Sequence, residues 1–169
     1  MNGGIICLSR IEAVKKNDWD KYQRPVMIAI RTPGDPPLEY NKGVFVAAEI
    51  YCHDVSLSEY EKQKKEGILL TPFNKDHAKI CCLAFLIAIA EESDIFIHCD
   101  MGVSRSRGVA AGLLEGIARE ANDPDVTEET RRAIAALYQG GHPNIDVKNL
   151  VREEAESLIR KMKRVDGLI

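Results

Sequence analysis

The sequence predicts an α/β fold, in which a central, mostly parallel sheet of four to five strands is flanked by helices. Two observations lead to this prediction. Short apolar runs alternate with longer amphipathic segments, with strands concentrated early in the chain and helices late. The length of 169 residues fits one domain with one core, and no repeat or linker divides it. We therefore expect a single domain spanning residues 1–169.

Four short apolar runs are the predicted strands. They comprise Ile5–Leu8, Val26–Ile30, Val44–Tyr51 and Ile95–Ile97. Runs this short and this apolar are typical of strands that are buried on both faces of a sheet. Between the second and third runs, residues 32–37 (Thr-Pro-Gly-Asp-Pro-Pro) have the composition of a turn.

Four helices are predicted around these strands. Apolar residues recur at helical spacing within Asn74–Glu91, and the segment Ser106–Glu120 is small and apolar on one side. Thr127 is predicted to cap the next helix, which the glycine pair at residues 140–141 ends. The last helix carries an apolar stripe along Val151–Met162.

Composition and charge exclude several classes of protein. Apolar residues make up 45% and charged residues 29% of the chain, which argues against global disorder, collagen-like repeats and a coiled coil. Lys and Arg number 23 against 26 Asp and Glu, so the net charge is −3. Such a chain gets no general electrostatic help in binding nucleic acid, and no nucleic-acid partner is expected. Any anion must be bound at a local site.

The cysteines and the apolar segments indicate where the protein works. Five cysteines, an odd number, predict reduced thiols in a cytoplasmic protein rather than a disulfide framework. No signal peptide is recognisable, and the longest apolar stretch, Ile80–Ala90, is about half of the ~20 residues that a membrane span needs. No membrane association is expected. His77 and Cys81 share a helical face, but core packing explains them better than zinc, so no metal is expected.

The most informative segment is residues 95–106, where a strand ends in a cysteine and a short loop leads into a helix. Cys99 would face the N-terminus of that helix, where the dipole places about half a positive charge, so we expect it to be a thiolate at neutral pH. Gly102 permits a positive φ, and the loop amides form an anion-binding nest. Arg105 can hold two oxygens of a tetrahedral anion in its planar fork. These groups together predict phosphoryl transfer to sulfur.

This segment resembles the H-C-x-x-G-x-S-R-S signature of cysteine-dependent protein tyrosine phosphatases, in the form usual for their dual-specificity branch. Every fixed position is matched, by His98, Cys99, Gly102, Ser104, Arg105 and Ser106. The resemblance is tight over Asp94–Leu114 and loose over Tyr51–Glu120. The loop sequence and the short chain look most like those of small prokaryotic or phage-type members. The resemblance implies a fold like that of the dual-specificity phosphatases.

The resemblance also implies a role for each residue of the loop. Cys99 would attack phosphorus and form a cysteinyl-phosphate, and Arg105 would bind the phosphate and stabilise the transition state. Ser106 would help to break down the intermediate by hydrogen-bonding the departing thiolate, with helix capping as the simpler alternative. His98 would support the loop without touching substrate. The backbone amides that would bind the phosphate are those of Asp100, Met101, Gly102, Val103, Ser104 and Arg105.

Enzymes of this family use an aspartic acid on a separate loop, upstream of the cysteine, as the general acid. Asp54 follows the third strand and leaves the sheet at the carboxyl edge, where Cys99 also emerges and where open α/β sheets bind ligands. Asp76 is the alternative, although it is also explained as a first-turn charge that complements a helix dipole. We favour Asp54. Residues 56–73 would then form a movable flap over the pocket.

The resemblance implies an enzyme, a protein-tyrosine or dual-specificity phosphatase that needs no cofactor. Its expected substrate is phosphotyrosine in a protein, with phosphoserine, phosphothreonine and small phosphomonoesters left open. Two alternatives remain, a phosphatase for phosphoinositides, nucleotides or RNA 5′ phosphates, and a non-catalytic phosphate-binding module. Asp100, Met101 and Val103 are acidic or apolar, which disfavours a highly anionic head group. The sequence does not indicate the oligomeric state.

Overall fold

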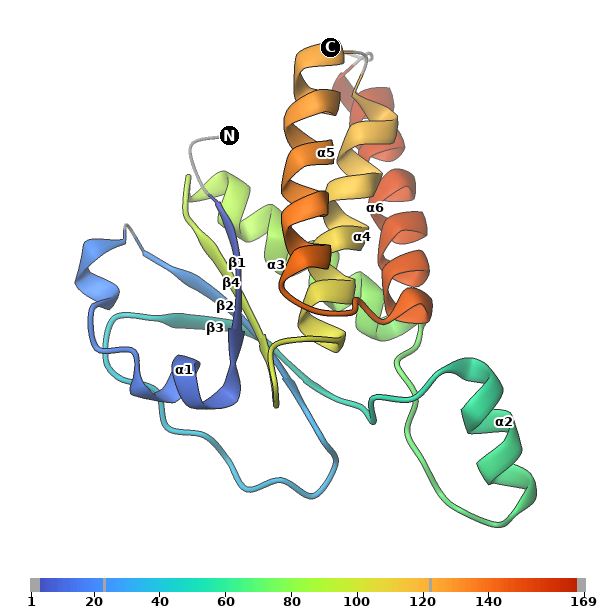
Figure 1. Cartoon of the computed structure of the whole chain (residues 1–169). Coiled ribbons are helices and arrows are strands. Elements are labelled where there is room, and N and C mark those ends of the chain that lie inside the picture. The colour runs from blue at the N-terminus through green and yellow to red at the C-terminus, as the bar shows by residue number, and fades with distance from the viewer. Residues whose placement is uncertain (1–3, 23, 122, 167–169) are drawn as a thin grey trace.

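The computed structural model describes residues 4–22, 24–121 and 123–166, and it contains one sheet of four strands in the order β1-β4-β2-β3 (Figure 1). The strands are β1 (Ile5–Ser9), β2 (Val26–Arg31), β3 (Phe45–Tyr51) and β4 (Ile95–Cys99). All three pairings between neighbouring strands are parallel. The central strands β2 and β4 are buried along their whole length, as their uninterrupted apolar runs predict. The predicted fold class is confirmed, with four strands.

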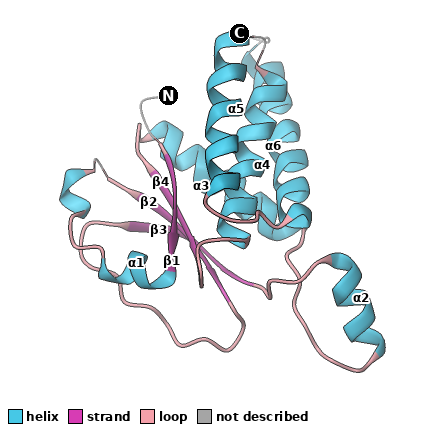
Figure 2. Ribbon diagram, in the orientation of Figure 1, coloured by secondary structure: helices cyan, strands magenta, loops and turns pink. Residues whose placement is uncertain are grey.

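Helices cover the two faces of this sheet unequally (Figure 2). The thicker layer contains α3 (Lys75–Ala90), α4 (Arg105–Glu120) and α6 (Ile145–Asp166), with α5 (Pro124–Gln139) packed against α4. The other face carries α1 (Arg10–Lys15) and a 3-10 helix, η1 (Trp19–Lys21). A further helix, α2 (Leu57–Lys65), projects from the body, and none of its residues is buried.

Two apolar clusters, one on each face, hold the layers together. The larger cluster joins strand residues such as Ile28 and Ile97 to Phe85, Val109 and Val151 of the thicker helical layer. The smaller cluster contains Ala13, Trp19, Met27 and Phe96, and the Trp19 and Phe96 rings meet edge to face with centroids 4.9 Å apart. Burial of this apolar surface is the main stabilising contribution, at about 25 cal/mol per Å².

The structure corrects one predicted helix start. Thr127 does not cap α5, which begins three residues earlier at Pro124 with Asp123 as its N-cap. The Asp123 side chain accepts a hydrogen bond from the Asp125 amide (2.9 Å), and Pro124 has the fixed φ that favours the first helical position. Thr127 instead donates its hydroxyl to the Asp123 carbonyl (2.9 Å). Gly140 caps the C-terminus of α5, as predicted.

The parallel register brings four chain segments to one edge of the sheet. Ser9 is paired with Cys99 at the carboxyl ends of β1 and β4, and Arg31 is paired with Tyr51 at those of β2 and β3. The residues that follow these strands therefore surround one region of space, which is where open α/β sheets bind ligands. Among the described helices, none has both the length and the apolar character to cross a bilayer.

Candidate active site

The loop between β4 and α4 places Cys99, Arg105 and Ser106 together. Cys99 is the last residue of β4 and Arg105 is the first of α4, so six peptide units separate the thiol from the guanidinium. All three are buried, at 2%, 3% and 0% exposure. The Cys99 Sγ lies 3.3 Å from the Ser106 Oγ. A hydroxyl at this distance can donate a hydrogen bond to a thiolate.

Gly102 allows the loop to approach β1 closely. Its φ is +71°, in the left-handed region, and a Cβ at this position would lie 2.6 Å from the Ser9 amide nitrogen. The loop is also held from outside by Arg107, whose Nε donates to the Gly102 carbonyl (2.8 Å) and whose Nη1 donates to the Leu137 carbonyl (3.0 Å). The sequence does not indicate Arg107, because no local pattern distinguishes it from an ordinary helix-surface arginine.

Three segments orient the guanidinium of Arg105. Its Nη1 donates to the Cys52 carbonyl (2.5 Å), which follows β3, and lies 3.4 Å from the Thr32 Oγ1, which follows β2. Its Nη2 forms an ion pair with the Asp100 carboxylate within the loop. The Nε is buried and has no hydrogen-bond partner among the described residues. One edge of the planar guanidinium therefore keeps an N–H donor, that of Nε, without a hydrogen bond.

Asp54 lies beside this loop, and Asp76 does not contact it. The Asp54 Oδ1 accepts hydrogen bonds from the Ser104 Oγ (2.9 Å) and the Asn144 Nδ2 (3.0 Å), and its Oδ2 is 3.9 Å from the Arg105 Nε. Asp76 is exposed in the first turn of α3, and in the described part of the chain it makes no hydrogen bond or ion pair with the loop.

Asn144 was missed by the sequence analysis, and it connects α6 to the loop. Its amide N–H donates to the Ser104 carbonyl (3.2 Å), and its Oδ1 accepts from the amides of Asp146 and Val147 (both 3.1 Å). The side chain thus caps the first turn of α6 while it holds Asp54. Its position before a helix is a capping signal in the sequence, but nothing local indicates the contact with Asp54, 90 residues away.

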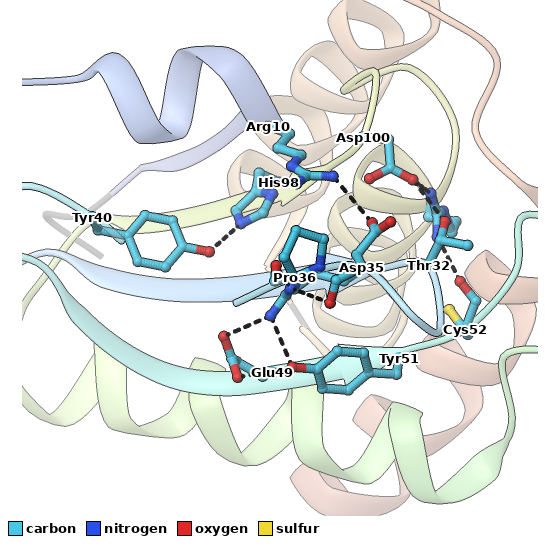
Figure 3. A network of polar contacts seen from close by, with 12 residues as sticks. Arg10, Thr32, Asp35, Pro36, Tyr40, Glu49, Tyr51, Cys52, His98 and Asp100 are labelled. Carbon is cyan, nitrogen blue, oxygen red and sulfur yellow. Dashed lines mark hydrogen bonds and ion pairs between the residues drawn. The ribbon is translucent and has the colours of Figure 1, made fainter. Parts of the chain in front are cut away.

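His98 lies on the other side of the loop, fully buried, with its Nε2 2.6 Å from the Tyr40 hydroxyl (Figure 3). Burial lowers the pKa of His98 to about 4, so the ring is neutral at neutral pH. Burial also raises the pKa of Tyr40 to about 12, which keeps its hydroxyl protonated. The two groups therefore share one neutral hydrogen bond, whose donor depends on the histidine tautomer. The pair links β4, the strand that ends in Cys99, to the segment between β2 and β3.

The turn after β2, with Thr32, Asp35 and Pro36, lies beside the loop (Figure 3). Arg31 holds this turn through hydrogen bonds to its backbone. Arg31 is buried, although it is charged, and it donates to the Tyr51 hydroxyl (2.8 Å) and to the carbonyls of Asp35 (2.9 Å) and Pro36. The Asp35 carboxylate also pairs with Arg10, at 3.2 Å. The composition of residues 32–37 predicted a turn, but it did not predict that a buried arginine would fix this turn next to the site.

Burial sets the protonation state of the other four cysteines. All five are free. Burial raises the pKa of Cys7, Cys52 and Cys82 to about 12, 11 and 12, and it raises that of Cys81 still further above its usual value. These four thiols remain protonated at neutral pH. Among the described residues, no group of three His, Cys, Asp or Glu side chains is placed to share a metal ion.

Comparison with known proteins identifies the fold. No family model matches the chain, and no curated protein matches its sequence. Human DUSP28 superposes with a TM-score of 0.59 and 14% identity over 93% of this chain and 94% of that chain. A mouse putative dual specificity phosphatase complexed with zinc tungstate gives 0.57 and 13%, over 91% and 83%. PTPMT1 in complex with PI(5)P gives 0.53 and 16%, over 94% of both chains. The chain has the fold of the dual-specificity phosphatases.

Proposed function

We propose that this protein is a phosphatase that hydrolyses phosphomonoesters through a cysteinyl-phosphate on Cys99. The observation that carries the proposal is the joint placement of the buried Cys99 thiol, the Ser106 hydroxyl 3.3 Å from it, and the Arg105 guanidinium around one loop at the start of α4. A helix N-terminus with converging amides favours an anion, and a thiolate beside it is a nucleophile.

The residues account for both steps of such a reaction. The loop amides and the Arg105 fork bind the phosphoryl oxygens, and the Cys99 thiolate attacks phosphorus while the bond to the leaving oxygen breaks. Asp54 donates its proton to that oxygen. In the second step water attacks the cysteinyl-phosphate and Asp54 takes up a proton from it, so that the phosphorus–sulfur bond breaks and inorganic phosphate is released. The Ser106 hydroxyl stabilises the thiolate as it departs.

Phosphotyrosine in a protein is the substrate that we propose. The loop brings no lysine or additional arginine between Cys99 and Arg105, so the site is built for one phosphoryl group rather than for a polyanionic head group. PTPMT1, which shares the fold, was solved with PI(5)P, and the fold is therefore compatible with lipid substrates as well. A panel of phosphotyrosine, phosphoserine and phosphothreonine peptides, nucleotides and phosphoinositides, ranked by kcat/KM, distinguishes these classes.

Hydrolysis of para-nitrophenyl phosphate in the presence of EDTA tests the enzyme itself. Wild-type protein should be active, and Cys99→Ser should reduce kcat by about 10⁴-fold or more, because the hydroxyl is a far weaker nucleophile. The matched control is Cys82→Ser, which changes a buried core cysteine whose Sγ donates to the Val151 carbonyl on α6 (3.8 Å) and which should retain activity. A wild-type protein without EDTA-resistant activity would contradict the proposal and favour a phosphate-binding module.

A further inference from the structure

The first residue of the loop after the cysteine, Asp100, turns its carboxylate onto the arginine that should bind substrate. The Asp100 Oδ2 accepts hydrogen bonds from the Thr32 Oγ1 (2.9 Å) and from the Arg105 Nη2 (Figure 3). The backbone of Asp100 is fixed too, because its carbonyl accepts from the Arg10 amide (3.2 Å). An anion-binding loop thus already contains an anion, and the fold holds it in place.

This arrangement affects the donors that a phosphate would use. Two oxygens of a tetrahedral anion bind best to two adjacent N–H groups on one side of a guanidinium. In Arg105 the Nη1 donates to the Cys52 carbonyl, and the Nε has no hydrogen-bond partner among the described residues, with the Asp54 Oδ2 3.9 Å away. The second donor on the side of Nε is Nη2, where Asp100 is bound. An incoming phosphate that takes Nε therefore meets the Asp100 carboxylate at Nη2.

The groups around Asp100 keep it charged. Burial by itself would raise the pKa of Asp100, but hydrogen bonds from Thr32 and Arg105 outweigh burial and hold the pKa below its usual value. Arg10 is the other nearby cation, and it pairs with Asp35. His98, behind the loop, is neutral because its pKa is about 4, and the Asp54 Oδ2 lies 3.9 Å from the Arg105 Nε. Two carboxylates thus flank one buried arginine.

We propose that Asp100 is a specificity-determining residue, whose carboxylate competes with substrate phosphate for Arg105 and restricts the site to ligands that carry a single phosphoryl group. The inference rests on the proposed function and deepens it by naming the substrate class. Repulsion between Asp100 and the ligand scales with the ligand's charge. A second phosphate on the substrate therefore weakens binding, although phosphate-binding sites usually gain affinity from added negative charge.

Binding of phenyl phosphate tests this without turnover. The probe is titrated calorimetrically into Cys99→Ser and into Cys99→Ser/Asp100→Asn at pH 7.5 and pH 5.0, on either side of the second phosphomonoester pKa of about 6. The dianion carries twice the charge of the monoanion. The logarithm of the gain in affinity caused by Asp100→Asn should therefore be twice as large at pH 7.5 as at pH 5.0. We expect Asp100→Asn to tighten binding about tenfold at pH 7.5 and about threefold at pH 5.0. A purely structural role would not produce this pH dependence.

Two further measurements complete the test. Asp125→Asn makes the same change of net charge at an exposed position in α5 and should alter the Kd by less than about twofold. The Cys99→Ser protein alone should bind hydroquinone bisphosphate more weakly than phenyl phosphate, a result that needs no change at Asp100. Equal or weaker binding after Asp100→Asn, or tighter binding of the bisphosphate, would overturn the inference alone. Binding of neither probe to any of these proteins would overturn the proposed function together with it.

Discussion

Two segments of the chain meet at the candidate site, and they are built in opposite ways. The segment from Cys99 to Ser106 joins a buried strand to a buried helix end, and Gly102 in its middle touches the backbone of β1. The segment from His53 to Phe73 leaves the body of the protein and returns to it (Figure 1). Its helix α2 has no buried residue, and Leu69 is 95% exposed.

The contrast separates two kinds of chemistry. The groups that we propose bind phosphate lie in the segment from Cys99 to Ser106, the densely bonded segment, where hydrogen bonds orient Arg105 before a ligand arrives. Such preorganisation is a large part of catalysis. Asp54, which would protonate the leaving group, lies at the start of the projecting segment. Its carboxylate is directed by bonds from outside that segment, from Ser104 and Asn144. The position of the Asp54 carboxylate thus depends on Ser104 of the first segment and on Asn144, which precedes α6.

The largest effect should come from changing the shape of the guanidinium while keeping its charge. Arg105→Lys should reduce kcat/KM for para-nitrophenyl phosphate by about 10³-fold, because an ammonium cannot bond the Cys52 carbonyl and Asp100 and still present a fork to phosphate. The control is Arg160→Lys, at an exposed site on α6. A loss of less than tenfold would mean that the donor geometry of this segment contributes little.

The next effect is a dependence of stability on pH that comes from His98, the residue before Cys99 on β4. His98 has a pKa of about 4 in the folded protein and about 6.5 when unfolded. Between these values the unfolded chain binds a proton that the folded chain does not, so the stability present above pH 6.5 is lost as the pH falls. Urea unfolding should show a loss of about 3 kcal/mol between pH 7 and pH 4. His77, whose pKa burial also lowers, acts in the same direction.

Replacement of His98 measures how much of the stability lost between pH 7 and pH 4 is due to this residue. His98→Gln should flatten the dependence of unfolding free energy on pH, whereas His142→Gln, at an exposed site, should not. An unchanged slope in His98→Gln would show that a group other than His98 controls acid sensitivity.

A smaller effect on rate is expected from the projecting segment. Asp54→Asn should lower kcat at neutral pH by about 10²-fold, the lower end of the range for general acid catalysis, because the leaving oxygen would depart unprotonated. Asp76→Asn, on the exposed first turn of α3, should leave kcat nearly unchanged. The reverse result would identify Asp76 as the general acid. Asp54, in the projecting segment, would then have no role in proton transfer.

The same contrast explains how much of the site could be predicted. Cys99, Gly102, Arg105 and Ser106 lie within eight residues, and each has a local reason to be there, so one stretch of sequence indicates all of them. The strands were found for a similar reason, because a buried strand is an uninterrupted apolar run. Thr127 was a wrong prediction, since Asp123 and Pro124 together provide the better helix start.

The residues that the sequence did not indicate are those that tertiary packing brings in. Thr32, Tyr40, Arg107 and Asn144 each contact the loop or the strand leading into it, and each comes from a different element or turn. No periodicity or spacing relates a turn after β2 to a carboxylate 68 residues later, as the bond between Thr32 and Asp100 does. The parallel register brings Thr32 to the edge where β4 ends, and the packing of loops and helices brings in the other three residues.

The smallest effect should come from the tip of the projecting segment. Leu69→Ser should change the free energy of unfolding by less than about 0.5 kcal/mol, because a side chain that is 95% exposed loses almost no buried surface. Phe73→Ala, four residues further on and 5% exposed where the chain rejoins the core, should cost about 3 kcal/mol. Both values come from urea unfolding. A loss of unfolding free energy above about 1.5 kcal/mol for Leu69→Ser would mean that this segment packs against the body in solution. The two segments would then not differ in burial as described.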